Sequence, residues 1–236
     1  MKILLVIPSY NEEKNIMKVY EGIREYNKKS KLKADYVFIN DGSTDGSKEI
    51  FKKNKLNHID LIHNLGIGGA VQTGYKYALK NNYDIAIQFD GDNQHDSAYI
   101  ETIIRPIIND GVDMVIGSRF VEISNGFQSS KLRQVGIKII SFFIKRFTHQ
   151  KIYDTTSGFR AIDRKLIEEF AKYYPTEYPE PVSIVTAIKK GYNVKEVKVE
   201  MRERLEGRSS IRSWKNVYYM VNVILSIISA GLRRYK

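Results

Sequence analysis

The first half of the chain repeats one pattern: a short apolar run rich in β-branched residues, then a Gly/Asn/Asp loop, then a stretch with helical periodicity. The predicted strands are 3–7, 36–40, 59–62, 85–89 and 114–116. Because parallel strands need long crossover connections, this alternation predicts an α/β fold with a mostly parallel central sheet and helices on both faces. In such sheets ligands bind beyond the carboxyl ends of the strands.

Polar residues follow each predicted strand. The segments concerned are 8–12, 40–45, 63–66, 90–95 and 117–120. Candidate functional residues are therefore expected there, at one edge of the sheet.

Asp90-Gly91-Asp92 is the most informative of these segments. Two carboxylates one residue apart point the same way in an extended segment, and hard cations prefer such oxygens. Mg²⁺ or Mn²⁺ bound there would bridge a diphosphate and offset the charge that grows on it as a leaving group. Gln94 and His95 follow directly. The alternative is ordinary turn chemistry, which Asp also favours.

Asp41 follows the second predicted strand, where its carboxylate can accept a hydrogen bond from a nucleobase ring N–H. A helix N-cap is the alternative, and it suits Asp45 or Ser43 better. The glycine-rich run that begins at Gly66 does not complete a dinucleotide-binding fingerprint, because Val71 stands where Gly or Ala is needed. Close approach of its backbone to a diphosphate at a helix start stays open.

Composition limits the kinds of partner. With 236 residues, 42% of them hydrophobic, the chain can bury one substantial core. Cysteine is absent, which excludes disulfides, thiolate metal sites and a cysteine nucleophile. The formal charge of +11 favours an anionic partner: nucleic acid, a phosphorylated metabolite or an acidic membrane surface.

The character of the sequence changes after the strand–helix alternation. Residues 131–151 interleave Lys and Arg with Ile and Phe and contain no acidic residue, which is typical of a helix at a membrane interface. Residues 211–236 hold a second apolar stretch, which is too short to span a bilayer alone. We therefore expect a catalytic domain over 1–210 and a membrane- or partner-contacting helix over 211–236. The alternative for both helices is packing against the core.

Seven ordered blocks resemble the family-two glycosyltransferases, in particular the branch that makes polyprenyl-phosphate sugars and includes dolichol-phosphate mannosyltransferase. The blocks are 7–12, 40–45, 64–74 (Asn-x-Gly-x-Gly-x-Ala-x-x-x-Gly), 90–95, 117–120, 154–160 and 204–209. The resemblance implies a GT-A fold, inverting transfer from a nucleotide sugar, and Mg²⁺ or Mn²⁺ as cofactor.

The resemblance also implies roles for individual residues. Nucleoside and donor contacts are expected from Pro8, Tyr10, Glu12, Asp41, Gly66, Asp90, Arg204 and Ser209. Metal ligands are expected at Asp90, Asp92 and Gln94, and Arg119 and Arg133 would face an acceptor phosphate.

Two acceptors stay open at this point. A polyprenyl phosphate, such as undecaprenyl phosphate, is already an anion and can attack without a base, whereas a sugar hydroxyl of a lipid-linked or cell-surface glycan needs one. Asp154 is the candidate base for the second case, with a turn or capping role as its alternative. The first case predicts a peripheral enzyme at the cytoplasmic face of the membrane, with or without a small membrane protein as partner. A non-catalytic basic module is a third hypothesis; carboxylates at the strand ends argue against nucleic acid, because they would repel its backbone.

Overall fold

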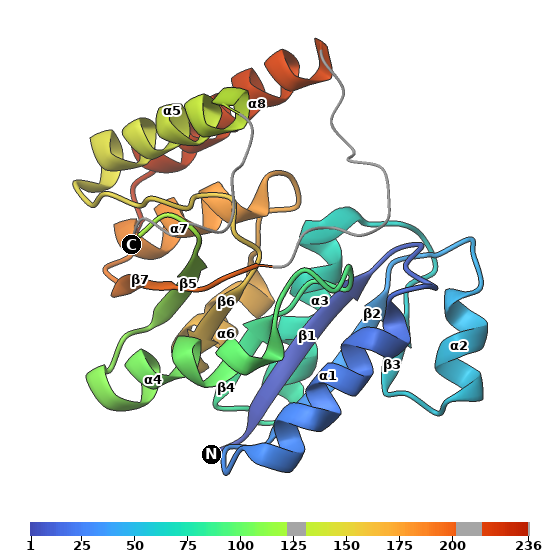
Figure 1. The fold of residues 1–236 in the computed structure, drawn as a ribbon. Helices are drawn as coiled ribbons and strands as arrows, with labels where there is room; N and C mark the ends of the chain where they lie inside the picture. Colours follow the sequence, from blue (N-terminus) through green and yellow to red (C-terminus); the bar gives the residue numbers. More distant parts are fainter. Residues whose placement is uncertain (122–130, 202–213, 236) are drawn as a thin grey trace.

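The computed structural model of the protein describes residues 1–121, 131–201 and 214–235, without the side chains of 131–133 and 214–219. Its centre is a seven-stranded sheet in the order β3-β2-β1-β4-β6-β5-β7 (Figure 1). The strands are β1 (Ile3–Ser9), β2 (Ala34–Asn40), β3 (His58–Asp60), β4 (Ile85–Gln88), β5 (Met114–Ser118), β6 (Arg160–Asp163) and β7 (Val194–Lys198).

The predicted mostly parallel sheet is confirmed. β1 pairs in parallel with β2 and β4, and β5 pairs in parallel with β7. β6 is antiparallel to both of its neighbours, β4 and β5. All five predicted strands are present within a few residues of their expected bounds. β6 and β7 were not predicted, because β6 lies beyond the regular strand–helix alternation and three of the five residues of β7 are charged.

Helices cover both faces, as expected (Figure 1). One face packs against α1 (Ile16–Lys29), α2 (Ser47–Lys53) and α4 (Ile100–Asp110). The other packs against α3 (Gly66–Lys80), α6 (Arg164–Lys172) and α7 (Pro179–Lys189). Every residue of β1 is buried, as the central strand of a sheet covered on both faces requires.

The glycines of α3 serve close packing. A Cβ on Gly68 would clash with the backbone of Pro175 and Thr176, and a Cβ on Gly74 would clash with the side chain of Val6. α3 therefore lies closer to the sheet and to the 175–176 segment than any larger residue would allow. By contrast, a Cβ on Gly66 would meet no atom within 4 Å, so the first residue of the helix stays open.

α5 (Lys131–Thr148) and α8 (Trp214–Leu232) form a pair that contacts α7, outside the layers that cover the sheet (Figure 1). The two helices run parallel, because Gly136 packs against Met220 while Gly231 packs against Phe147. Their inner residues, such as Ile144 and Ile227, are completely buried in the core.

The outer sides of the same helices are apolar and exposed. We call these residues the outer apolar strip, and all of them are between 40% and 70% exposed: Val135, Ile139, Phe142, Val221, Leu225 and Leu232. The inner side of both helices therefore packs in the core, as the alternative interpretation expects, and the outer side is exposed in the described part of the chain. Membrane contact of these helices stays a prediction. Among the described residues, no helix combines the length and apolarity needed to cross a membrane.

Candidate active site

The loop after β4 carries the Asp-Gly-Asp motif and is held between two other strands. A Cβ on Gly91 would lie 2.8 Å from the carbonyl oxygen of Pro8 at the end of β1. A Cβ on Gly158, just before β6, would lie 2.5 Å from Oδ2 of Asp90. Both glycines therefore allow a close approach that fixes the Asp90 carboxylate at this edge of the sheet.

The carboxylates of the motif suit a metal ion whose remaining ligands come from a substrate. The backbone N–H of Gln94 donates to Oδ1 of Asp92 at 3.1 Å, and this local hydrogen bond stabilises a turn within the loop. Among the described residues no three His, Asp or Glu side chains gather into a metal site of their own. Mg²⁺ is commonly held by one or two carboxylates together with substrate phosphates, so Asp90 and Asp92 fit a cation that binds with a diphosphate.

His95 lies against Asp90 and is only 3% exposed. Its Nδ1 accepts a hydrogen bond from the backbone N–H of Asp90 at 3.0 Å, and its Nε2 is 3.4 Å from Oδ2 of the same residue. Burial lowers the pKa of His95 to about 4, although the charge of Asp92 acts in the opposite direction. The ring is therefore neutral at physiological pH.

Arg119 and Asp154 form a buried ion pair next to this loop. Nε of Arg119 donates to Oδ2 of Asp154 at 2.7 Å, and Nη2 donates to Oδ1 at 2.8 Å. Oδ2 also accepts the backbone N–H of Arg119, and Nη2 reaches Oγ1 of Thr156. Asp154 is 0% exposed. Both oxygens of its carboxylate therefore hold the guanidinium of Arg119. Such a bidentate pair fixes the orientation of the arginine side chain.

Glu196, on β7, supports this ion pair and was not predicted. Its two carboxylate oxygens accept the backbone N–H groups of Tyr153 and Asp154 at 2.7 and 2.8 Å. Burial raises the pKa of Glu196, and the two backbone hydrogen bonds act against that rise. No local pattern identifies this residue, because its function depends on a partner segment 42 residues away.

The residues expected to bind the nucleoside lie at the ends of β1 and β2. Asp41 is buried and its Oδ1 accepts the backbone N–H of Leu65 at 2.7 Å. Burial raises the pKa of Asp41, partly offset by hydrogen bonds from Leu65 and Gly66. Tyr10 is half-exposed at the same edge, and Glu12 accepts a hydrogen bond from Asn15 at 2.6 Å.

The other predicted site residues divide into two groups. Pro8 is a buried member of β1; Asp90, Asp92 and Gln94 form the loop after β4, and Arg119 and Asp154 form the buried ion pair described above. Arg204 and Ser209 lie outside the described residues, and only the backbone of Arg133 is described, at the start of α5.

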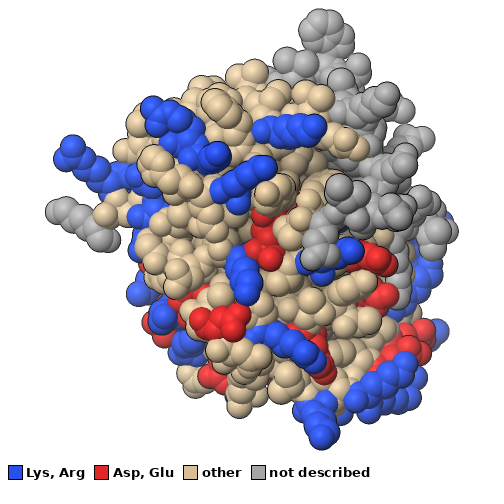
Figure 2. Space-filling model, turned by 60° about the vertical axis from the view of Figure 1, so that its left-hand side comes forward, with Lys and Arg blue, Asp and Glu red and all other residues tan. Residues whose placement is uncertain are grey.

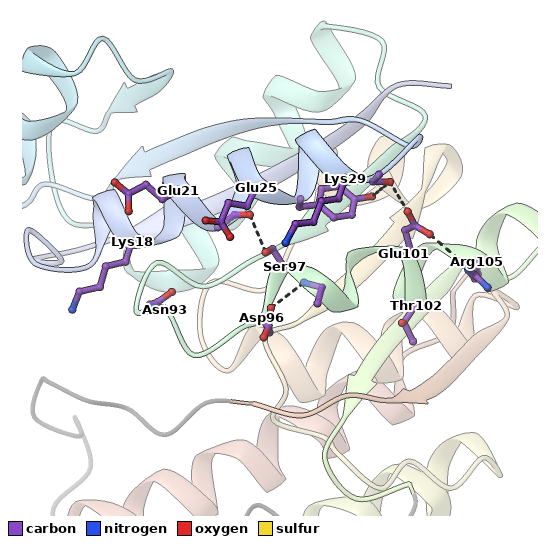
Figure 3. A pocket seen from close by; sticks show the side chains of 14 residues that line it. Lys18, Glu21, Glu25, Lys29, Asn93, Asp96, Ser97, Glu101, Thr102 and Arg105 are labelled. Atoms are coloured by element: carbon purple, nitrogen blue, oxygen red, sulfur yellow. Dashed lines mark hydrogen bonds and ion pairs between the residues drawn. The ribbon is translucent and has the colours of Figure 1, made fainter.

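A separate groove of about 800 Å³ lies between α1 and the segment that leads into α4 (Figure 3). Charged side chains of both signs line it, among them Lys18, Glu25 and Arg105. It reaches the metal-motif loop only at Asn93, and it contains none of the predicted site residues. The sequence-predicted site is therefore a different part of the surface.

Comparison with known proteins identifies relatives along most of the chain. The profile described as "Glycosyl transferase family 2" matches residues 4–171. The UDP-N-acetylglucosamine–dolichyl-phosphate N-acetylglucosaminyltransferase of Methanococcus voltae is 30% identical, over 84% of this chain and 84% of its own. The polyprenol monophosphomannose synthase of Mycolicibacterium smegmatis is 24% identical, over 88% of this chain and 80% of its own.

Among solved structures, glucosyl-3-phosphoglycerate synthase of Mycobacterium tuberculosis in complex with Mn²⁺, UDP-glucose and phosphoglyceric acid matches with a TM-score of 0.73. The match covers 98% of this chain and 79% of that one at 17% identity, which confirms the GT-A-like fold. The fold, the motif at the end of β4 and the two sequence relatives agree. The chain belongs to glycosyl transferase family 2.

Proposed function

We propose that the protein is an inverting glycosyltransferase that moves a sugar from a nucleotide-diphosphate sugar to a polyprenyl phosphate at the cytoplasmic face of a membrane. The observation that carries this proposal is that the Asp90 carboxylate packs against Gly158, four residues after Asp154, whose carboxylate holds the guanidinium of Arg119. A carboxylate pair suits a metal-bound diphosphate, and an oriented guanidinium suits a second phosphate.

Asp90, Asp92 and Gln94 would hold Mg²⁺ or Mn²⁺. A divalent cation bound there supplies positive charge that stabilises the departing nucleoside diphosphate. Pro8, Tyr10, Glu12 and Asp41 would hold the nucleoside, with Gly66 open for a close approach to the diphosphate. Arg204 and Ser209 would complete the donor site, and Arg133 would assist Arg119.

The reaction needs no general base in this proposal. A phosphate oxygen of the acceptor attacks the anomeric carbon, the bond from that carbon to the diphosphate oxygen breaks, and the nucleoside diphosphate leaves with the bonding electrons. Asp154 was the candidate base for a hydroxyl acceptor. Its carboxylate already accepts three hydrogen bonds from Arg119 and is fully buried. This favours a positioning role for Asp154 and, with it, the phosphate acceptor.

The outer apolar strip would place the site at the lipid surface. In the view of Figure 2, the upper part of the molecule carries Lys and Arg with no Asp or Glu among them, whereas acidic side chains lie lower. This is the part of the molecule that α5 and α8 occupy in Figure 1. Exposed apolar residues next to cations are the arrangement that binds anionic membrane surfaces. A small membrane protein that covers part of the strip is compatible with the same surface.

The test is to incubate the protein with Mg²⁺ or Mn²⁺, a polyprenyl phosphate and a panel of nucleotide sugars. Mass spectrometry then detects a lipid-phosphate-sugar, and Asp92→Asn serves as the inactive control. A product with the wild type and none with the control supports the proposal and names the sugar. Metal-dependent binding of a nucleotide sugar without lipid product would instead favour a sugar hydroxyl as acceptor. No binding of any nucleotide sugar would overturn the glycosyltransferase proposal with either acceptor.

A further inference from the structure

The histidine that follows the metal motif is buried, and its ring packs between two phenylalanines. The ring of His95 stacks on Phe159 with centroids 4.8 Å apart and planes at 19°. Phe89 meets its edge with centroids at 5.4 Å. The backbone of His95 forms an isolated antiparallel bridge with Met201. The two phenylalanines therefore confine the ring, and the bridge to Met201 holds the backbone that carries it.

The hydrogen bonds of the ring fix its tautomer. Because Nδ1 accepts the backbone N–H of Asp90, Nδ1 carries no proton, and the proton of the imidazole resides on Nε2. Nε2 lies 3.4 Å from Oδ2 of Asp90. One residue thus holds both the main chain and the carboxylate of Asp90, from five positions further along the chain.

We propose that His95 is a positioning residue for the metal site: it closes the 90–95 loop through the hydrogen bond at Nδ1 and restrains the Asp90 carboxylate through the contact at Nε2. This inference rests on the proposed function, since it concerns the cation that the donor diphosphate brings. Hydrogen-bonded neighbours that orient a metal-binding side chain typically change metal affinity by 10–100-fold when they are removed.

The chain contains a matched control. His58 also stacks on a phenylalanine, Phe51, with centroids at 5.1 Å and planes at 17°. Its Nε2 is also near a carboxylate, 3.9 Å from Asp60. It lies on β3, and none of the predicted metal ligands is in its contacts. The same His→Phe substitution at the two positions therefore separates the loss of a stacked imidazole from the loss of contact with Asp90.

The experiment measures Mn²⁺ binding by electron paramagnetic resonance, in the presence of UDP or GDP, whichever the wild type binds. Thermal unfolding of each variant is measured alongside. We expect His95→Phe to weaken Mn²⁺ binding at least tenfold and His58→Phe to leave it within twofold of the wild type. An unchanged affinity in His95→Phe would overturn the proposal.

Two amide variants keep the test decisive if His95→Phe fails to fold. The longer side chain of Gln can place its amide NH₂ at the position of Nε2. The shorter side chain of Asn reaches only the position of Nδ1, where its amide oxygen can accept the backbone N–H of Asp90. We expect His95→Gln to bind Mn²⁺ at least threefold more tightly than His95→Asn, and equal or reversed affinities would refute the orienting role of Nε2. If the wild type itself binds no Mn²⁺ with either nucleotide, the proposed function fails too, which is a distinct result from failure of the variants alone.

Discussion

At the scale of single residues, the site depends on charges that are buried and paired. Asp154 is fully buried and faces Arg119, so Asp154→Asn leaves a buried guanidinium without its counter-charge. We expect the free energy of unfolding to fall by about 3 kcal/mol, as for other broken buried pairs. Denaturant unfolding measures this change. Glu168→Gln is the control, because it removes an exposed pair with Arg164 and should change stability by less than about 0.5 kcal/mol.

Glu196 gives a prediction about pH. Its folded-state pKa is raised above the ordinary 4.5, chiefly by burial. A carboxyl with a raised folded pKa contributes stability that is fully present below its unfolded pKa and is lost as pH rises through the folded pKa. Glu196→Gln cannot titrate. We therefore expect the stability of the wild type relative to Glu196→Gln to decrease as pH rises from 4.5 through the raised pKa. Denaturant unfolding over this range measures the difference, and a flat profile would contradict the prediction.

At the scale of elements, the approach of α3 to the sheet depends on glycine. Gly74→Ala would push a methyl group into Val6, so we expect a loss of about 1–3 kcal/mol in the free energy of unfolding. Gly22, within α1, is the matched control. A Cβ there would lie 3.5 Å from Oγ of Ser97, which is an ordinary contact. Gly22→Ala should therefore raise stability by about 0.5–1 kcal/mol. Equal effects at both positions would show that α3 can move away from β1.

The helix pair gives a prediction about membrane binding. Phe142→Glu removes an exposed aromatic residue from the outer apolar strip without touching the core. We expect about tenfold weaker partition into anionic vesicles, since burying such a side chain contributes roughly 1.5–3 kcal/mol. Vesicle sedimentation measures the partition. Ile62→Glu makes the same kind of change at a side chain that is 91% exposed outside the strip, and it should leave partition nearly unchanged. Equal losses in the two variants would rule out the strip as the membrane contact.

Deleting α8 would test the same point less cleanly. Val223 and Ile227 of this helix are completely buried, so its removal would expose core surface of α5 and α7. The resulting instability would be hard to distinguish from lost membrane contact. Surface substitutions are therefore the sharper experiment.

At the scale of the whole molecule, the net charge of +11 adds a sequence-wide attraction to anionic surfaces. We expect binding to anionic vesicles to exceed binding to zwitterionic ones and to weaken as salt rises from about 50 to about 500 mM, because the Debye length shortens. A remainder that does not respond to salt is expected from the outer apolar strip. Vesicle sedimentation across the salt series measures both parts, and binding that ignores lipid charge would contradict the prediction.

The fold class and the metal motif could be predicted because their signals are local. A run such as Ile3–Ser9 is apolar throughout, as a strand buried on both faces must be, and Asp90 and Asp92 follow the next central strand directly. The functions of Glu196 and His95 could not be predicted in the same way. A glutamate in the charged segment Val194–Lys198 looks like a solvated residue until the partner backbone is known.

The sequence by itself thus determined the alternation of strands and helices, the carboxylates at the end of β4 and the basic, apolar character of α5 and α8. The tertiary structure decided the rest: that β6 enters antiparallel between β4 and β5, that Asp154 is committed to Arg119, and that one side of the helix pair is core and the other exposed. The physical reason is the sequence separation over which each kind of interaction acts. Periodicity and turn chemistry act between neighbours along the chain, whereas strand order, ion pairs and burial depend on which distant segments pack together.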